Sequence, residues 1–157
     1  HHASSAASDV YKRQAFKDVV GLFFGAADSS ASLGCKLAWE PLLYARQKVV
    51  LAAAMYNLFT IDAPFFYIDD KEGLKKEAEA VKNLGFTGKA AIHPDQIDFI
   101  NESFAPTSEE IAEGKKVLEE YQKSGGGAVK IDGQMVDEPI AEAMRLKISL
   151  GEEEKED

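Results

Sequence analysis

The fold is decided by residues 58–94, LFTIDAPFFYIDDKEGLKKEAEAVKNLGFTGKAAIHP. Two short apolar segments, Leu58 to Ala63 and Lys89 to Pro94, have the length and composition of buried strands. Between them, Asp69 or Asp70 can cap a helix that Gly85 ends. The apolar residues of this helix recur at helical spacing, at Leu74, Ala78, Val81 and Leu84. A strand, a helix and a strand in this order predict a βαβ unit with parallel strands.

The same alternation extends toward the N-terminus. The run VVGLFF, residues 19–24, predicts another buried strand, and Pro41 suits the first turn of a long helix. The predicted strands follow one another at intervals of about 30 residues or slightly more, the length of a βαβ crossover. We therefore expect an α/β fold with a parallel sheet. Because three strands do not close a barrel, the sequence indicates the back part of a larger (β/α) protein.

The pattern becomes mainly helical after residue 94. Residues 95–104 predict a short helix with Ile97 and Ile100 facing inward, and Thr107 with Glu110 fits a capping box. The helix that follows the capping box places its apolar positions on one side: Ile111, Val117, Leu118 and Tyr121.

A glycine-rich segment separates this helix from the last one. Residues 124–128, SGGGA, predict a flexible hinge, and VKIDG, residues 129–133, predicts a strand or a turn. Asp137 is placed to be the N-cap of a final amphipathic helix through Leu150. We therefore expect residues 105–150 to form a helical extension and lid, appended to the (β/α) part at residues 15–104.

The two ends of the chain differ from the body in composition. Residues 1–14, HHASSAASDVYKRQ, have no apolar period, and we expect them to be an unstructured tag, vector or adapter remnant. Residues 151–157, GEEEKED, predict a solvated acidic tail. On this view the coding sequence of the natural protein also extends upstream of Ala15.

Composition narrows the function classes. Of the 157 residues, 45% are hydrophobic and 29% are charged, which is typical of a soluble globular protein. The net charge of −9 disfavours binding to nucleic acid or to an anionic membrane, and the longest apolar runs fall short of the roughly 18 residues of a membrane-spanning helix.

The single cysteine, Cys35, cannot form an intrachain disulfide, so we expect a buried thiol in a reducing, cytoplasmic compartment.

Two carboxylates follow predicted strands, on the face where (β/α) barrels carry their chemistry. Asp28, in the segment FFGAAD, is either a ligand for a hard metal ion such as Mg²⁺ or the cap of the next helix. Asp62, in TIDAPF, has the same placement, and for it we favour a structural hydrogen-bonding role.

The segment GFTGKAAIHP, residues 85–94, is the next candidate. Its glycine spacing is not that of a P-loop, but exposed backbone groups and a cation at the end of a late strand suit the phosphates or thioester arm of a cofactor. The alternative is a helix C-cap followed by a strand. His93 is a poor candidate for a zinc ligand, because the other histidines are His1 and His2 in the predicted remnant.

Asp137 is the third candidate. It follows the glycine hinge, so it lies on a segment that can close over a site. Its carboxylate could then transfer a proton there. The structural alternative is that it only caps the final helix.

Five segments, in their order and spacing, resemble the HpcH/HpaI aldolase/citrate lyase family and, within it, the CoA-ester lyases such as malyl-CoA and citramalyl-CoA lyases. The segments are GLFFGAAD, LAWEPLLYAR, TIDAPF, LGFTGKAAIHPDQI and GGGAVKIDGQMVDEP. The resemblance covers Ala15 to Leu150. It implies a partial TIM (β/α)₈ barrel, with strands 6 to 8 and a C-terminal helical lid.

The resemblance also implies a set of site residues. Asp28 matches the aspartate that holds Mg²⁺, together with a glutamate from an earlier strand. Lys89, Ala90, Ala91 and His93 match the loop that meets coenzyme A, and Asp137 matches the acid/base on the lid. The implied reaction is Mg²⁺-dependent cleavage of a C–C bond in a 3-hydroxyacyl-CoA, which gives an acyl-CoA and a 2-oxo acid.

Two alternatives stay open. The chain can derive from a citrate lyase β-subunit that acts on a citryl-acyl-carrier protein, or it can be a non-catalytic half-barrel that binds CoA thioesters. The resemblance further implies a homotrimer or hexamer for the full-length protein. We expect the fragment alone to be inactive, because the arginines and the second metal carboxylate of the family's first half are absent from it.

Overall fold

The computed structural model describes residues 19–125 and 127–153. The predicted remnant at residues 1–14 lies outside the described residues, as do Gly126 and residues 154–157 of the predicted acidic tail. The chain divides into two compact units, the first ending at Phe104 and the second beginning at Ala105, and each has its own hydrophobic core. Within the described part of the chain, no helix combines the length and the apolar character that crossing a membrane requires.

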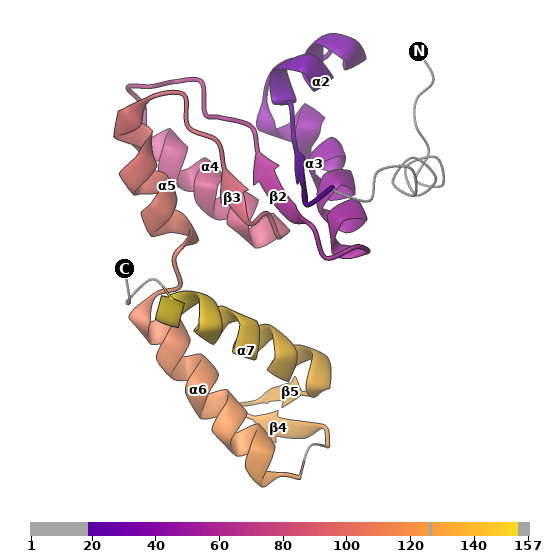
Figure 1. The fold of residues 1–157 in the computed structure, drawn as a ribbon, viewed down its shortest axis with the longest axis vertical. Helices are drawn as coiled ribbons and strands as arrows, with labels where there is room; N and C mark the ends of the chain where they lie inside the picture. Colours follow the sequence, from indigo (N-terminus) through magenta and orange to yellow (C-terminus); the bar gives the residue numbers. More distant parts are fainter. Residues whose placement is uncertain (1–18, 126, 154–157) are drawn as a thin grey trace. The chain divides into compact units, whose positions relative to one another are not determined.

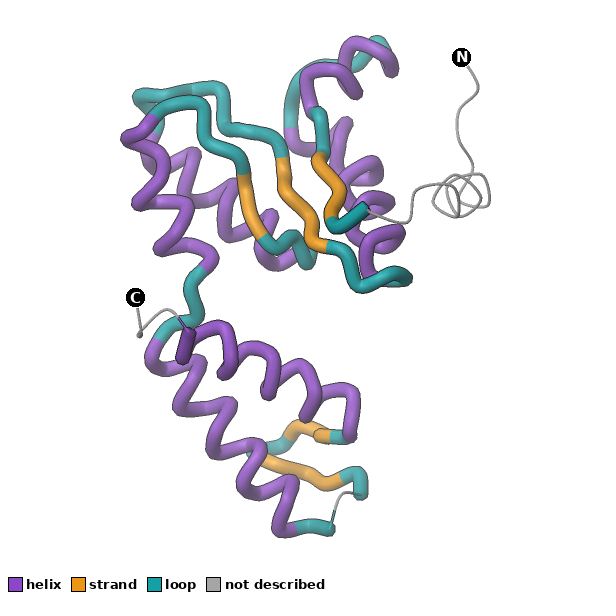
Figure 2. The backbone as a smooth tube through the Cα atoms, in the orientation of Figure 1, coloured by secondary structure: helices purple, strands orange, loops and turns teal. Residues whose placement is uncertain are grey.

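The first unit is built on a parallel sheet of three strands in the order β1-β2-β3 (Figures 1 and 2). These strands are β1 (Gly21–Phe23), β2 (Phe59–Asp62) and β3 (Gly88–Lys89). In the parallel register, Phe23 lies beside Ile61 and Ile61 beside Gly88. The expected α/β class and the parallel pairing are confirmed.

Helical segments connect and follow these strands: α2 (Ala26–Leu33), α3 (Trp39–Ala54), α4 (Lys71–Leu84), the 3₁₀ turn η1 (Pro94–Gln96) and α5 (Ile97–Phe104). The helix α4 begins and ends as predicted. The Asp70 carboxylate accepts a hydrogen bond from the backbone N–H of Gly73 at 2.9 Å, and Gly85 takes the left-handed conformation with φ 99°.

The helices α3 and α4 lie on one face of the sheet (Figure 1). On that face Phe24, Leu42, Val81 and Phe86 are buried in one core cluster, against which the half-buried Cys35 packs. This corrects the expectation of a buried thiol at Cys35, which is only partly buried.

The opposite face of the sheet is uncovered by the described residues. Phe23 is 60% exposed and Phe59 is 53% exposed, although residues 19–24 were expected to form a buried strand. Strand residues alternate between the two faces, so a strand is buried on both sides only where both faces carry a second layer. The strand itself is present, but Leu22 is only half-buried, and the buried residue of the segment is Phe24, directly after the strand.

Two boundaries near residue 94 also differ from the expectation. The strand β3 ends at Lys89, and Ala90 to His93 form a loop instead of the rest of a strand. In α5, Ile100 is buried as predicted, but Ile97 is 48% exposed. The 3₁₀ turn η1 precedes α5, and its tighter winding shifts the helical phase at Ile97.

The second unit consists of α6 (Ser108–Lys123), a hairpin of β4 (Val129–Ile131) and β5 (Gln134–Val136), and α7 (Glu138–Glu153). The predicted capping box is present: the Thr107 hydroxyl accepts from the Glu110 N–H, and the Glu110 carboxylate accepts from the Thr107 N–H.

The hairpin turns at Asp132 and Gly133, both at positive φ (48° and 89°), as a type I′ turn requires. The sequence pattern predicted only a strand or a turn here. The core side chains of the second unit come from each of its helices and strands: Tyr121, Ile131, Val136 and Ala141.

A polar contact joins the two helices of the second unit. The buried Tyr121 donates its hydroxyl hydrogen to Glu138 Oε2 at 3.0 Å, and Arg145 Nη1 donates to Glu138 Oε1 at 2.7 Å. The hydrogen bonds from Arg145 and then Tyr121 hold the pKa of the Glu138 carboxyl below its usual value of 4.5. Burial, reinforced by the hydrogen bond to Glu138, raises the pKa of Tyr121.

This contact predicts how the second unit responds to acid. A carboxyl whose pKa is lowered on folding stabilises the folded state above its unfolded pKa, and this contribution is lost as the pH falls through the folded value. We therefore expect Glu138→Gln to lower the urea midpoint at neutral pH, and to lose less stability than the parent below pH 4.5. The NMR resonances of the Tyr121 ring, which belong to the second unit alone, report the transition. Glu113→Gln, at an exposed position of α6 outside this contact, serves as the control. Parallel pH profiles for the parent and Glu138→Gln would contradict the assignment.

Candidate active site

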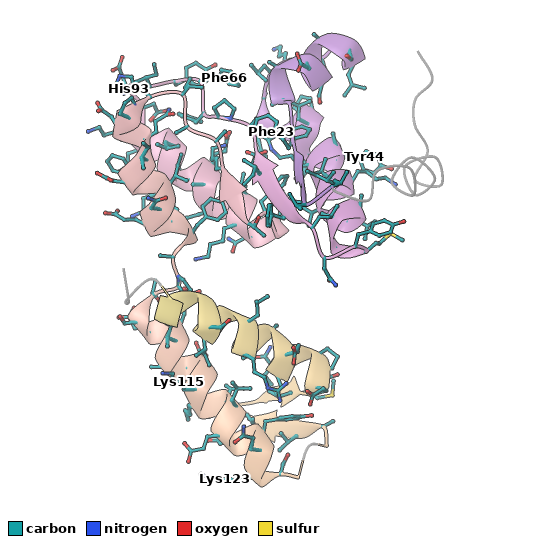
Figure 3. The ribbon with its side chains drawn as sticks, in the orientation of Figure 1. Phe23, Tyr44, Phe66, His93, Lys115 and Lys123 are labelled. Atoms are coloured by element: carbon teal, nitrogen blue, oxygen red, sulfur yellow. The ribbon has the colours of Figure 1, made fainter. Side chains whose placement is uncertain are left out.

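The first unit brings the predicted residues to one edge of its sheet. Asp28 follows β1, Asp62 ends β2, and Ala90 to His93 follow β3. Since the strands are parallel, their carboxyl ends meet at the same edge, where α/β proteins place ligands. Figure 3 shows Phe66 and His93 on the loops that follow β2 and β3 at this edge.

Asp28 lies in the first turn of α2 and is exposed. The N-cap position belongs to Gly25, which makes no side-chain cap, so the alternative of Asp28 as the cap of this helix is wrong. Its carboxylate makes no hydrogen bond or ion pair with any described residue, and the helix dipole favours a negative charge there. Among the described residues, no group of three or more His, Cys, Asp or Glu side chains is arranged to hold a metal ion.

A buried ionic cluster lies beneath this edge. Asp62, at the end of β2, is fully buried and accepts from two cations: Arg46 Nε of α3 at 2.8 Å and Lys89 Nζ of β3 at 2.8 Å. Lys89 Nζ also donates to Glu77 Oε1 of α4 at 2.6 Å and to the Ala63 carbonyl at 2.7 Å. The structural role expected for Asp62 is confirmed, and Lys89 shares that role.

The position of Lys89 changes what its side chain can do. Its side chain is 0% exposed, and its three N–H donors meet three acceptors. A lysine whose hydrogen bonds are satisfied inside the protein has no donor left for a phosphate at the surface. Any contact of this segment with a ligand therefore comes from the loop beyond Lys89.

Arg46, a buried member of this ionic cluster, is a residue that the sequence pattern did not single out. It lies one turn after Leu42 on the buried face of α3, with its guanidinium carbon 5.1 Å from the centroid of the Phe24 ring and 4.8 Å from that of Trp39. The available signal was an arginine on the otherwise apolar, buried face of α3. A buried charge is paired or it is strongly destabilising, so this arginine predicts a buried acid nearby.

The loop after β3 is fixed by backbone hydrogen bonds. Ala90 N–H donates to the Asp62 carbonyl at 2.9 Å, and Ile92 N–H donates to Gln96 Oε1 at 2.9 Å. The buried Gln96 amide in turn donates to the Phe65 carbonyl at 2.9 Å, which ties this loop to the loop after β2. The sequence pattern did not predict these hydrogen bonds of Gln96, because in the sequence it is an ordinary polar residue of a short predicted helix.

His93 and Ala91 lie at the outer side of this loop. Ala91 is exposed, and His93 is half-buried with Nδ1 accepting a hydrogen bond from the Asp95 N–H at 3.2 Å. With Nδ1 turned toward the Asp95 backbone, Nε2 is the ring nitrogen that is left for a ligand. His93 therefore offers one ring nitrogen at the edge of the sheet.

Asp137 belongs to the second unit. It directly precedes α7, its carbonyl accepts from the Ala141 N–H at 2.9 Å, and its Oδ1 accepts from the Ile140 N–H at 3.4 Å. The predicted N-cap is thus present, with a long side-chain hydrogen bond. The half-buried carboxylate retains a second oxygen for other partners.

Relatives of known class share this sequence. The chain is 35% identical over 147 residues to the mitochondrial citramalyl-CoA lyase of Rattus norvegicus. This alignment covers 87% of this chain and 44% of the lyase. It is 34% identical over 137 residues to the citrate lyase subunit beta of Haemophilus influenzae. This alignment covers 84% of this chain and 47% of the subunit. The chain thus spans about half the length of the curated relatives it matches.

Solved structures share the fold. The CitE protein of Mycobacterium tuberculosis in complex with magnesium, acetoacetate and coenzyme A superposes with a TM-score of 0.75 at 31% identity, over 85% of this chain and 52% of that one. A citrate lyase from Burkholderia xenovorans superposes with a TM-score of 0.79 over 96% of this chain and 51% of that one, and at 20% identity it supports the fold alone.

The family match agrees with the mixed α/β fold of the first unit. The sequence model of one family, described as HpcH/HpaI aldolase/citrate lyase, matches residues 5–94, which is more than half of the chain. The chain belongs to the HpcH/HpaI aldolase/citrate lyase family.

Proposed function

We propose that this chain contributes the C-terminal part of a Mg²⁺-dependent CoA-ester lyase, which cleaves a C–C bond of a 3-hydroxyacyl-CoA into an acyl-CoA and a 2-oxo acid. The observation that carries the proposal is Asp28: an exposed carboxylate without a described partner, at the carboxyl end of a parallel strand, in a chain of a lyase family. The C–C lyase relatives in two organisms and the magnesium and coenzyme A bound by the CitE protein support it.

The residues of this chain fit part of a magnesium site. Mg²⁺ is usually held by one or two carboxylates, with water and substrate oxygens completing its shell. Asp28 supplies one such carboxylate, and its oxygens are free of described protein partners. The second carboxylate then comes from outside the described residues. When bound, the ion supplies Lewis-acid stabilisation of the oxygen that gains negative charge as the C–C bond breaks.

The coenzyme A contact is proposed for the loop after β3. Lys89 fixes the start of this loop from inside, while Ala90, Ala91 and His93 form its outer part. Because Ala90 N–H and Ile92 N–H are already bonded, the loop offers a ligand the backbone N–H groups of Ala91 and His93 and the Nε2 side of the His93 ring. Small side chains at positions 90 and 91 allow a ligand to approach the backbone closely.

Asp137 is proposed as the proton-transfer group. It follows a glycine-rich segment and the β4–β5 hairpin, and one of its carboxylate oxygens is not used by the N-cap. A carboxylate near the thioester can accept a proton from the acyl carbon and return it, which is the step that an enolate-forming cleavage requires. The two classes of relatives, citramalyl-CoA lyase and citrate lyase subunit beta, make citramalyl-CoA and citryl-acyl-carrier protein the substrates to compare.

The metal assignment predicts the effect of Asp28→Asn. The chain is fused to the N-terminal segment of a relative that it does not match, and cleavage of malyl-CoA and citramalyl-CoA is assayed with Mg²⁺. We expect Asp28→Asn to lower kcat by at least about a hundredfold, because the metal contributes several kcal/mol to the transition state. Asp98→Asn, an exposed first-turn aspartate of α5, is the matched control and retains activity. Full activity of Asp28→Asn would show that the metal lies elsewhere.

The acid/base assignment predicts a different pattern for Asp137→Asn. In the same fused enzyme, kcat falls by roughly a hundredfold to ten-thousandfold with little change in KM, because asparagine keeps the shape of the cap but cannot transfer a proton. Exchange of the acyl-CoA α-hydrogens with solvent deuterium, followed by NMR, is lost in parallel. Asp132→Asn, an exposed acid of the same unit, leaves both readouts unchanged. Retained hydrogen exchange in Asp137→Asn would remove it from this role.

The buried cluster predicts that Lys89 stabilises the fold instead of binding coenzyme A. Lys89→Met leaves two carboxylates of the cluster short of a cation, and we expect a loss of about 3–5 kcal/mol in the free energy of unfolding, measured by urea titration of this chain. Lys75→Met, on the exposed surface of α4, is the control. Unchanged stability together with weaker coenzyme A binding would mean that the Lys89 ammonium reaches the ligand.

A further inference from the structure

A small cavity of about 60 Å³ opens at the carboxyl ends of β1 and β2. Its floor is apolar and buried, with Ala26 and Leu42 nearly inaccessible to solvent. Its rim is formed by exposed apolar side chains, Leu37 and Phe66, so the cavity communicates with solvent. A volume of this size has room for a few water molecules or for one small polar group attached to a longer ligand.

Arg46 supplies an unused hydrogen-bond donor to this cavity. Its Nε is bound to Asp62, and its side chain lines the cavity while remaining 3% exposed overall. Its Nη1 is buried and has no hydrogen-bond partner among the residues that the structure describes. A buried donor of a charged group without a partner is unfavourable, so an acceptor that enters the cavity gains a hydrogen bond and relieves the unsatisfied donor.

The charges around the cavity decide the kind of acceptor. Arg46 and Lys89 are positive and Asp62 and Glu77 are negative, so the cluster is electrically balanced, with two charges of each sign. A carboxylate or phosphate entering the cavity would add an uncompensated charge to a poorly solvated region. An uncharged carbonyl accepts the same hydrogen bond without that penalty. Glu77, at the same wall, is 21% exposed and can accept from an amide N–H beside the carbonyl.

We propose that this cavity binds an uncharged amide group carried on an apolar arm, with the amide carbonyl oxygen accepting from Arg46 Nη1. Under the proposed function, on which this source of the ligand rests, the arm is the amide-bearing pantetheine portion of a CoA ester. The apolar stem lies along the rim at Phe66 and Leu37. Arg46 therefore has two roles, pairing with Asp62 through Nε and recognising the ligand through Nη1.

The test uses the chain as it is, labelled with ¹⁵N, and free pantetheine as the probe. We expect a saturable change in the NMR resonances of Arg46 Nε–H and of the Phe65 and Phe66 amides. Acetamide and acetate, which have nearly the same shape and differ in charge, are then compared as competitors. Acetamide displaces pantetheine and acetate does not. Equal or better displacement by acetate would overturn the requirement for an uncharged group, and with it the proposal.

Two variants separate recognition from folding. Ala38→Phe, at a lining position that is not itself a member of the ionic cluster, fills the mouth of the cavity, and we expect it to abolish pantetheine binding. Ala54→Phe, at the exposed end of the same helix, is the matched control and binds normally. Arg46→Lys keeps a positive charge for Asp62 but lacks Nη1, and it weakens binding roughly tenfold to a hundredfold.

The outcomes also separate this proposal from the proposed function. If the parent does not bind pantetheine, or if Ala38→Phe binds it as the parent does, the proposal is wrong whether or not the fused enzyme cleaves CoA esters. If pantetheine binds in the predicted way while the fused enzyme lacks lyase activity, the proposed function fails and the amide site stands. Neither binding measurement involves Asp28, Asp137 or a metal ion.

Discussion

The pairing of Asp62 with Arg46 and Lys89 is the interaction on which the first unit depends. It joins α3, β2 and β3 through one carboxylate, and Glu77 extends it to α4. Removing any one member leaves its partners charged and buried, so the four residues are stable only as a set. The same set determines where Ala63 and Ala90 begin their loops, since Lys89 Nζ binds one carbonyl and Ala90 N–H binds another. The geometry of the candidate site is therefore inherited from an ionic cluster beneath it.

The sequence predicts the elements well where local physics determines them. The cap at Asp70, the left-handed stop at Gly85 and the capping box at Thr107 depend on neighbouring residues only, and all are present. The errors occur where distant contacts decide. The strand β3 ends early because the loop from Ala90 to His93 is bonded to Asp62 and Gln96. Phe23 is exposed because no described layer covers the sheet face opposite the helices. Neither fact is written in the local pattern.

The candidate site shows the same division. Residue type and spacing were enough to single out Asp28 and Asp137, because a carboxylate just after a strand or before a helix is visible in the sequence. The burial of Lys89 was not visible, since lysine is usually exposed and its partner Glu77 lies on the polar pattern of α4. Arg46 needed the opposite inference, from a charge at an apolar position. Its role follows from the distances that the fold creates, which no single sequence window contains.

The sheet face that the described residues leave uncovered bears on how this chain is expected to behave in solution. Phe23 and Phe59 present apolar surface that attracts other copies, while a net charge of −9 repels them. The electrostatic repulsion between copies reaches far at low salt, but at roughly 0.1 M salt it is screened beyond about 10 Å. The apolar attraction is not weakened by salt. Ionic strength thus sets the balance between dispersed and associated chains. On this physical argument we expect the isolated chain to stay dispersed in dilute buffer and to associate more readily at high salt.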